Sequence, residues 1–328
     1  MARPNCIEAF DARRPVAKRD GRRRRLVSPR RATGPSAQVF HGYDIRGILA
    51  TLGELAGTKS FQYDSIERLT GVSQTYPAPS TQIESYTYDL EGNRIASHIS
   101  PAYVTDDAIR VLDDGINKYS WSPNGALTTR VPKANSAGAL TFWNSWHGYF
   151  NQVRLDAIGG ALPMHFYYDP LGRMAPRVFD YDATLGVQDR YHDGPDVALE
   201  IRNRLSPTPQ WARYVHGPGD DQPLALELYP PGAPPTSGTG TQYYYHADGE
   251  GSIRLLTDSN GQIADRYDYD YDSYGQRLSV VESAPQPYGW KARDFVPGPN
   301  LVFNRARFYD PVLGRFVEED PIGYTPTH

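Results

Sequence analysis

The chain has 328 residues, of which 39% are hydrophobic, and its mean hydropathy is −0.59. No apolar run approaches the length needed to span a membrane, and the single cysteine, Cys6, excludes disulfide bracing and thiolate metal sites. The formal net charge of −4 hides a split, because residues 1–31 carry 11 Lys and Arg against 3 acids, whereas the remainder carries 23 against 35.

The basic residues gather in a leader over residues 1–40, which contains the run Arg22–Arg25. Such a run could bind nucleic acid. No aromatic residues interleave with it, however, and the acidic remainder of the chain would repel phosphates. We therefore predict a disordered Arg- and Pro-rich leader and no nucleic-acid partner. No apolar signal-peptide core follows the basic run, so export from the cytoplasm would need a dedicated secretion system.

A self-similar unit recurs along the chain, in which an aromatic residue precedes Asp-x-x-Gly and a basic residue follows, and residues 41–241 are assigned to the array of these repeats. Its clearest copies are Tyr63–Leu69, Tyr88–Arg94, Tyr168–Arg173, Tyr271–Arg277 and Tyr309–Arg315, and decayed copies are Trp121–Gly125, Trp146–Gly148, Tyr191–Gly194 and Tyr214–Gly217. Successive copies are mostly roughly 20 to 35 residues apart, which indicates a repeat architecture in which each unit packs on its neighbours. The only candidate helix is Gly47–Leu55.

Each unit has the composition of a β-hairpin. The aromatic residue would end one strand, the Asp side chain would accept backbone N–H groups of the turn, and Gly would occupy the position with positive φ. Glu67 replaces this Gly in the first clear copy, so that turn is expected to be of another type. The sequence therefore predicts an all-β fold of consecutive antiparallel hairpins in one curved, shell-like sheet.

The repeat array ends in a Pro- and Gly-rich loop at residues 230–241, which is expected to join two strands over the surface. Farther on, Arg266–Asp272 alternates Tyr and Asp. An EF-hand loop would need Gly and Glu where Ser273 and Ser279 stand, so the alternation is interpreted as a strand. The eight His residues are scattered, and no phosphate-binding loop or nucleophile elbow occurs. No metal, cofactor or conventional catalytic site is predicted.

The end of the chain carries its most specific motif. A Tyr-Asp unit is followed closely by Asp-Pro-Ile-Gly, and the positions that define the motif are Tyr309, Asp310, Pro311, Gly314, Arg315, Phe316, Asp320, Pro321 and Gly323. Together with Tyr243–Arg254, this run resembles the Rhs-repeat-associated core of Rhs/YD-repeat proteins. The resemblance covers residues 60–323 and is strongest from residue 242, so we assign residues 242–323 to that core and residues 324–328 to a truncated tail.

The resemblance implies a β-shell that encloses a C-terminal toxin cargo. It also implies that the protein is secreted or placed in the cell envelope by a specialised secretion system. The expected partners are the rest of such a shell or a toxin and immunity pair. The resemblance also implies that Asp320 is one half of an autoproteolytic carboxylate pair whose second Asp would lie downstream. Because that partner is not in this sequence, the chain is expected to be a structural segment and not an enzyme. The alternatives are a carbohydrate-binding or adhesion module, with glycans as partners, and an active autoproteolytic core.

Overall fold

The computed structural model describes residues 40–54, 57–74, 81–136, 138–144, 150–157, 160–179, 186–265, 271–277 and 284–320. The chain divides into two compact units, Met1–His98 and Ile99–His328. The described residues contain antiparallel strands and two short 3-10 turns, and no α-helix. The predicted all-β, antiparallel fold class is therefore confirmed, although the described strands form three sheets and not one. Within these ranges no helix is long and apolar enough to cross a membrane.

The first unit contains one six-stranded sheet in sequential order. Its strands are β1 (Phe40–Tyr43), β2 (Leu49–Glu54), β3 (Gly57–Tyr63), β4 (Leu69–Gln74), β5 (Thr81–Tyr88) and β6 (Arg94–Ser97). The predicted helix at Gly47–Leu55 is wrong, because Leu49–Glu54 is strand β2. Gly47 instead completes a turn with a φ of 84°, and β2 pairs with both β1 and β3.

The second unit contains a fifteen-stranded antiparallel sheet, again in sequential order. Its strands are β7 (Val104–Thr105), β8 (Val111–Asp113), β9 (Asn117–Trp121), β10 (Leu127–Pro132), β11 (Ala139–Asn144), β12 (Phe150–Ala157), β13 (Gly160–Tyr168), β14 (Met174–Phe179), β15 (Gly186–Asp193), β16 (Asp196–Arg202), β17 (Gln210–His216), β18 (Pro223–Leu228), β19 (Thr241–Ala247), β20 (Ile253–Asp258) and β21 (Ile263–Asp265). The Pro- and Gly-rich loop joins β18 to β19, which are neighbours, so the sheet continues without interruption across residue 241.

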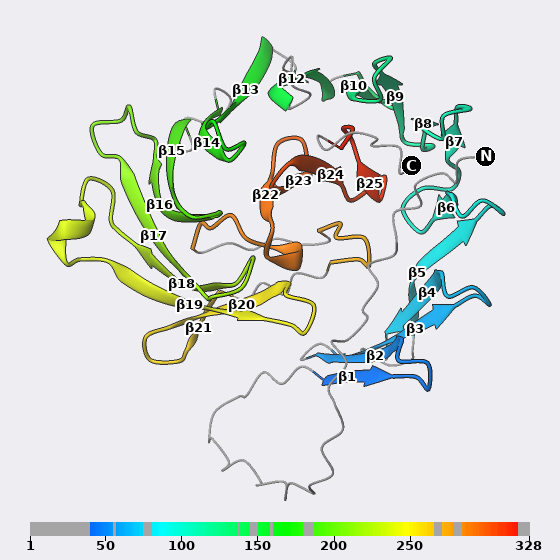
Figure 1. Ribbon diagram of the computed structural model, residues 1–328, viewed down its shortest axis with the longest axis horizontal. Coiled ribbons are helices and arrows are strands. Elements are labelled where there is room, and N and C mark those ends of the chain that lie inside the picture. Colours follow the sequence, from blue (N-terminus) through cyan, green and yellow to red (C-terminus); the bar gives the residue numbers. More distant parts are fainter. Residues whose placement is uncertain are drawn as a thin grey trace, which may run out of the picture. The chain divides into compact units, whose positions relative to one another are not determined.

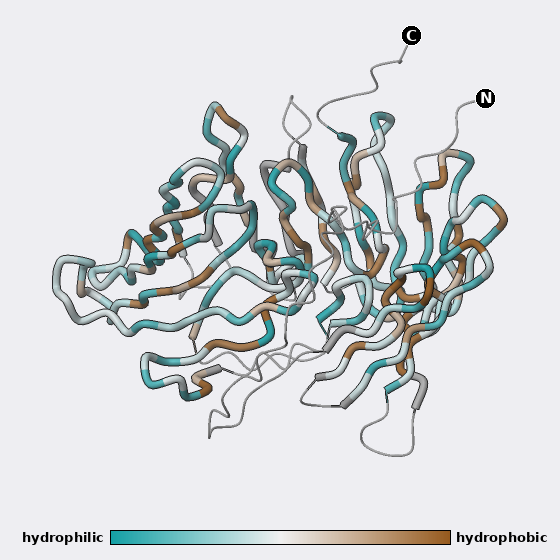
Figure 2. Tube along the Cα trace, turned by 60° about the horizontal axis from the view of Figure 1, so that its bottom comes forward, coloured by the Kyte–Doolittle hydropathy of each residue, from teal (hydrophilic) through white to brown (hydrophobic). Residues whose placement is uncertain are grey.

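A four-stranded antiparallel sheet follows, made of β22 (Asp294–Val296), β23 (Leu301–Asn304), β24 (Arg307–Asp310) and β25 (Arg315–Phe316). Within this unit the strands β8 to β21 curve around β22–β25 (Figure 1). Along the strands hydrophobic and hydrophilic stretches alternate, as expected for sheets with one buried face (Figure 2).

The turns of the repeating unit share one hydrogen-bond pattern. In the turn that begins at Asp64, the Asp64 N–H donates to the Arg68 carbonyl at 2.9 Å and the Glu67 N–H donates to the Asp64 carbonyl at 3.1 Å. Asp64 Oδ1 also accepts the Ile66 and Arg68 N–H groups. The same two backbone bonds close the turns that begin at Asp44, Asp89, Asp106, Ser122, Asp169, Asp248, Asp258 and Asp272.

The aromatic and basic residues of the unit connect successive hairpins. The Tyr88 hydroxyl donates backwards to the Leu69 carbonyl at 2.7 Å, and the Arg68 guanidinium donates forwards to the Asp89 carbonyl at 2.8 Å. Trp121 and Arg110 make equivalent bonds. The spacing of Tyr, Asp and Arg in the sequence therefore serves both the turn and the contact with the next turn.

Three predictions about individual turns need correction. Glu67 does not change the turn type, because it adopts a φ of 69° at the position where Gly92 has 91°. The decayed copies at Tyr191–Gly194 and Tyr214–Gly217 end strands without forming this turn: β15 and β16 meet at Gly194, and the longer loop after β17 is closed by the Gly217 N–H on the Gln222 carbonyl. The copy at Trp146–Gly148, and most of Arg266–Asp272, lie outside the described residues.

The backbone of Glu67 generates a stability prediction. A non-glycine residue in the left-handed region costs about 1–2 kcal/mol, partly offset by the greater freedom of glycine in the unfolded chain. Glu67→Gly should therefore raise the free energy of unfolding by about 0.5–1 kcal/mol, measured by urea denaturation. The lost Arg46–Glu67 pair, at 3.8 Å between exposed side chains, should contribute little. Glu91→Gly is the matched control, because in that turn Gly92 already occupies the left-handed position. A decrease in the free energy of unfolding that is equal in the two variants would contradict the prediction.

Candidate functional site: buried contacts of the C-terminal segment

The described residues of the C-terminal motif belong to a segment, residues 284–320, that covers one face of the fifteen-stranded sheet. Two apolar clusters join them. In the first cluster Val296, Leu301, Phe303 and Phe308 pack with residues of β8 to β14, including Leu127, Phe142, Phe166 and Met174. In the second cluster Ala284, Tyr288 and Ala292 pack with Ala212, Tyr214, Leu226 and Leu256 from β17, β18 and β20. This segment is called the C-terminal segment below.

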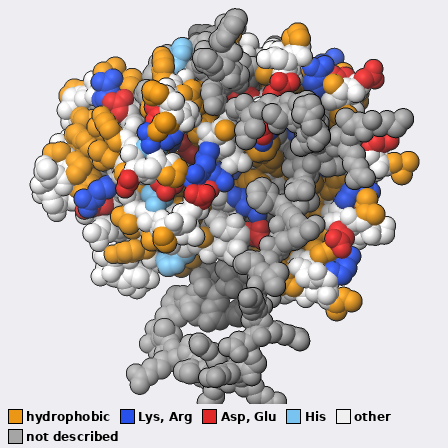
Figure 3. All heavy atoms as spheres, in the orientation of Figure 1, with side chains coloured by type: hydrophobic (Ala, Val, Ile, Leu, Met, Phe, Trp, Pro, Cys, Tyr) orange, Lys and Arg blue, Asp and Glu red, His pale blue; other side chains and the backbone are white. Residues whose placement is uncertain are grey.

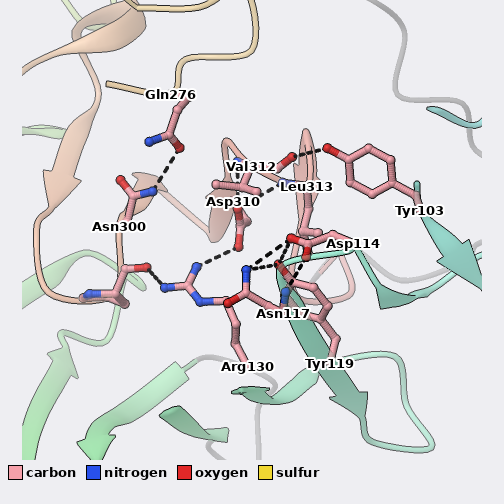
Figure 4. Close-up of polar contacts among 11 residues, drawn as sticks. Tyr103, Asp114, Asn117, Tyr119, Arg130, Gln276, Asn300, Asp310, Val312 and Leu313 are labelled. Carbon is pink, nitrogen blue, oxygen red and sulfur yellow. Dashed lines mark hydrogen bonds and ion pairs between the residues drawn. The ribbon is translucent and has the colours of Figure 1, made fainter. Parts of the chain in front are cut away.

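Asp310 lies at the first apolar cluster and is fully buried. The Arg130 Nη1 atom of β10 lies 3.1 Å from Asp310 Oδ2, and the Val312 and Leu313 N–H groups donate to Asp310 Oδ1 (Figure 4). Arg130 also donates to the Pro299 carbonyl. Burial raises the pKa of the Asp310 carboxyl, although Arg130 and the two N–H groups act in the opposite direction. Arg130 and Asp310 form the first charged cluster.

Two further polar side chains lie beside this pair. The Tyr119 hydroxyl donates to Asp114 at 2.7 Å, and Asp114 also accepts the Asn117 N–H. Burial, together with the Asp310 and Asp114 carboxylates, raises the pKa of Tyr119, which keeps this phenol protonated. The Tyr103 hydroxyl donates to the Val312 carbonyl at 3.2 Å (Figure 4). The carboxylates here are held by donors on fixed strands and turns, as in a structural contact.

A second charged cluster joins β15 and β16 to the C-terminal segment through Arg190, Glu200, Arg202 and Asp294, all of them buried. Arg190 pairs with Glu200 at 2.9 Å and with Asp294, and Arg202 pairs with the other oxygen of Glu200. Arg202 also donates to the Pro285 carbonyl at 2.8 Å. Burial opposes the charge of Arg190, but Asp294 and Glu200 raise its pKa. The two cations and two anions compensate one another away from water.

A third charged cluster lies at the turn between β23 and β24. Arg305, which has a φ of 60°, lies 3.1 Å from Asp221 in the loop after β17. Arg293 approaches the other oxygen of Asp221 at 2.7 Å. Three separate charged clusters thus fix the C-terminal segment to the fifteen-stranded sheet.

The predicted processing residue, Asp320, lies apart from these clusters. Its side chain is 46% exposed and pairs with Arg307 Nη2 at 2.9 Å, and the Arg307 guanidinium lies 3.8 Å from the centre of the Phe316 ring. The neighbouring Glu318 is buried and accepts the Phe308 N–H. Pro321 and Gly323 lie outside the described residues.

The other residues of the motif have structural contacts. Tyr309 donates to the Tyr274 carbonyl at 3.0 Å and packs edge-to-face on Phe316, and Arg315 donates to the Ile109 carbonyl. The turn after Asp310 is one residue longer than in the other units, because the Gly314 N–H, and not that of Leu313, donates to the Asp310 carbonyl. Pro311, Val312 and Leu313 separate Asp310 from Gly314 here, whereas two residues stand between Asp and Gly in the other units.

Five charged residues of these clusters belong to no sequence motif and were not predicted: Arg130, Arg190, Glu200, Arg202 and Asp294. In β15 and β16 the charged residues occupy alternate positions along the strand, which point to the buried face, while the residues between them are more exposed. A charged residue at such a position is the one signal that the sequence offers. Among the described residues, no group of three or more His, Cys, Asp or Glu side chains could hold a metal ion. The chemistry of this site is the fixing of one segment on another.

Comparisons with known proteins agree with the toxin relationship. No family model matches the chain. It is 25% identical over 321 residues to the double-stranded DNA deaminase toxin A of Burkholderia cenocepacia, covering 90% of this chain and 22% of that protein. It is 24% identical to the toxin protein Tse5 of Pseudomonas aeruginosa, covering 87% of this chain and 23% of Tse5. The chain thus spans about a fifth of the length of the curated relatives it matches.

A Tc holotoxin pore structure from Photorhabdus luminescens matches 87% of this chain and 18% of that chain, with 16% identity and a TM-score of 0.44. A likeness at this TM-score does not show a common fold. The sequence similarity to two bacterial toxins over most of the chain does support a relationship with Rhs-type toxins.

The first charged cluster should be costly to break. Arg130→Met leaves the Asp310 carboxylate buried without its cation, which should lower the free energy of unfolding by about 3–5 kcal/mol at neutral pH. The loss should shrink on acidification, because protonation of Asp310 removes the uncompensated charge. Arg204→Met is the control, since Arg204 pairs with Asp189 at 2.6 Å on the surface and should cost under about 1 kcal/mol. The free energy of unfolding is measured by urea denaturation. An equal decrease in the two variants would show that the buried Arg130–Asp310 pair is no more important than a surface pair.

His192 on β15 generates a pH prediction. Burial, with Arg190 and Arg173 nearby, lowers its pKa from 6.5 to about 4. A group whose folded-state pKa is lowered in this way binds a proton more readily when the chain unfolds. Its contribution to stability is therefore complete above pH 6.5 and is lost as the pH falls from 6.5 to 4. His192→Gln should flatten, though not abolish, the fall of the melting temperature over this range, because burial also lowers the pKa of His98 and His246. Parallel profiles of melting temperature against pH for the variant and the native chain would contradict this prediction.

Proposed function

We propose that the chain is a structural segment of the β-shell of an Rhs/YD-repeat polymorphic toxin, a shell that encloses a C-terminal toxin cargo. The observation that carries the proposal is the fifteen-stranded sheet whose apolar face is covered by the C-terminal segment of the same chain. Similarity to two bacterial toxins over most of the chain supports it. In this proposal residues 242–323 are the Rhs-repeat-associated core and the preceding repeats are wall.

The wall and the core have the properties that this role requires. A wall needs hairpins that connect to their neighbours along the chain, and Tyr88, Arg68 and their counterparts supply such contacts. A core that seals a shell needs to stay fixed to the wall. The three charged clusters meet this need, because each joins the C-terminal segment to the fifteen-stranded sheet. Sheet edges are the natural points of attachment for further wall, and β7 and β21 stand at the two ends of the described sheet.

The DNA on both sides of the coding region tests this proposal. Further Tyr-Asp repeats upstream, with a toxin domain and an immunity gene downstream, would support a shell segment. At the protein level, a chain extended by these flanking sequences should protect the cargo from added protease. Protection should be lost in the Arg130→Met variant at temperatures where that variant has unfolded. Unrelated genes on both sides, or a cargo cleaved as fast as the free cargo, would refute the proposal.

A carbohydrate-binding or adhesion module is the second candidate, because aromatic side chains are exposed on the sheet. Trp143, Tyr167, Tyr191 and Tyr244 are 37–52% exposed, and Tyr167 stacks on His165. Hydrophobic and charged side chains are interspersed on the side where β15 to β19 lie (Figure 3). A glycan array separates the candidates, since a shell wall predicts no saturable binding. Binding that is lost on Tyr167→Ala would favour the adhesion module.

Under the shell proposal, Asp320 is half of a processing site that is silent in this chain. Peptide hydrolysis by carboxylates needs one to hold a proton while the other activates water. Among the described residues, Asp320 pairs with Arg307, and Glu318 is occupied by a backbone N–H. Export by a specialised secretion system, after a cytoplasmic stage, belongs to the same proposal.

The purified protein should therefore stay intact over several days, and Asp320→Asn should change no fragment pattern. The lost pair with Arg307 should lower the free energy of unfolding by under about 1 kcal/mol, because Asp320 is 46% exposed. Intact mass spectrometry is the measurement. Cleavage of the native chain that disappears in Asp320→Asn would mean that another carboxylate completes the pair, and the chain would then be an active autoprotease.

A further inference from the structure

The turn between β9 and β10 departs from the repeating unit at its two chemically important positions. In the turns that begin at Asp64, Asp106 and Asp169, the residue after the fourth position is Arg, and its Nε donates back to the Asp carboxylate at 2.6–2.7 Å. In the turn at residues 122–126 the Asp is replaced by Ser122 and the Arg by Ala126. The Ser122 hydroxyl still accepts the Ala126 N–H at 3.1 Å, so the turn itself is preserved.

A peptide of the C-terminal segment lies against this turn, as another does against the turn that begins at Asp248, where the Ile253 N–H donates to the Gly289 carbonyl at 3.0 Å. The Leu127 N–H donates to the Val317 carbonyl at 2.8 Å. A Cβ atom on Gly125 would come within 3.1 Å of the Cγ and Oε1 atoms of Glu319. Ala126, between these two contacts, is only 3% exposed, whereas the side chains of the corresponding Arg68, Arg110 and Arg173 are 27–31% exposed. A long side chain at position 126 has no comparable space.

The adjoining turn holds the same peptide farther upstream. Arg315 donates to the Ile109 carbonyl, in the turn at residues 106–110, and Arg110 in turn donates to the Ser122 carbonyl at 3.0 Å. On its other side, the peptide is fixed by the Val317 N–H on the Phe308 carbonyl at 3.0 Å. Residues 315–319 therefore lie between β24 and these two turns.

We infer that the turn at residues 122–126 has small residues at positions 125 and 126 because it is the seat of residues 317–320, and that Gly125 and Ala126 position Asp320. The small residues let the peptide approach, so that the Val317 carbonyl reaches the Leu127 N–H. Gly125 and Ala126 are thus positioning residues. The role of Asp320 in processing rests on the proposed function. The seat itself does not, because it can be measured without any cleavage.

Restoring the repeating unit tests this inference, because the two explanations predict opposite signs. If the turn had merely decayed, Ser122→Asp with Ala126→Arg would add an Asp–Arg pair, and the melting temperature would stay the same or rise. If the turn is a seat, Arg at position 126 displaces the peptide. The melting temperature should then fall by several degrees, and amide hydrogen exchange over residues 313–320 should accelerate at least tenfold.

Gln262→Arg is the matched control. Gln262 occupies the same position in the turn that begins at Asp258 and is exposed, so this variant should change neither quantity. An unchanged or raised melting temperature in the double variant, with unchanged exchange over residues 313–320, would overturn the inference.

A second pair of variants decides the matter if the double variant does not fold. Gly125 and Gly251 occupy the same turn position, with φ values of 79° and 85°, so alanine is equally strained at both. A Cβ on Gly251, however, meets no atom within 4 Å. Gly125→Ala should accelerate exchange over residues 313–320 at least tenfold relative to Gly251→Ala. Equal exchange there in the two variants would overturn the inference.

Discussion

The second unit depends on the covering of one face of its large sheet. A single layer of antiparallel strands buries its apolar face only if another layer lies on it. Here that layer comes from the same chain, since Val296, Leu301, Phe303 and Phe308 supply the apolar side chains that Phe142, Phe166 and Met174 require. The strands β8 to β14 and the C-terminal segment therefore need each other, although more than a hundred residues separate them in sequence.

Apolar burial alone does not fix the register of one layer on the other, and the charged clusters add directional contacts. A buried ion pair contributes little net stability compared with an apolar pair of the same volume, but removing one partner is costly. Arg130 with Asp310, and Arg190 with Glu200 and Asp294, thus penalise any arrangement in which the C-terminal segment is shifted. A segment that is held in a single register can present Asp320 at a fixed place, which is the property that a processing site would need.

The repeating unit shows how one short pattern serves several requirements. Asp64 closes its own turn, Arg68 reaches the next turn, and Tyr88 reaches back to the previous hairpin. Where the pattern is broken, the surroundings differ. Glu67 keeps the turn at the cost of a strained backbone, whereas Ser122 and Ala126 stand where another part of the chain lies close. A deviation from the pattern is therefore not evidence of decay unless its surroundings are known.

The sequence by itself determined the all-β class and most of the turns, because alternation along a strand and the hydrogen bonding of Asp with Gly are local effects. It also identified Tyr309, Asp310 and Arg315 as one motif, but not their roles. Only the tertiary structure decided that Asp310 is fully buried against Arg130, that Leu49–Glu54 is a strand and not a helix, and that Val317 and Glu319 lie against Leu127 and Gly125. These features arise from contacts between residues up to about 190 positions apart, and such contacts leave no periodic signal in a single sequence.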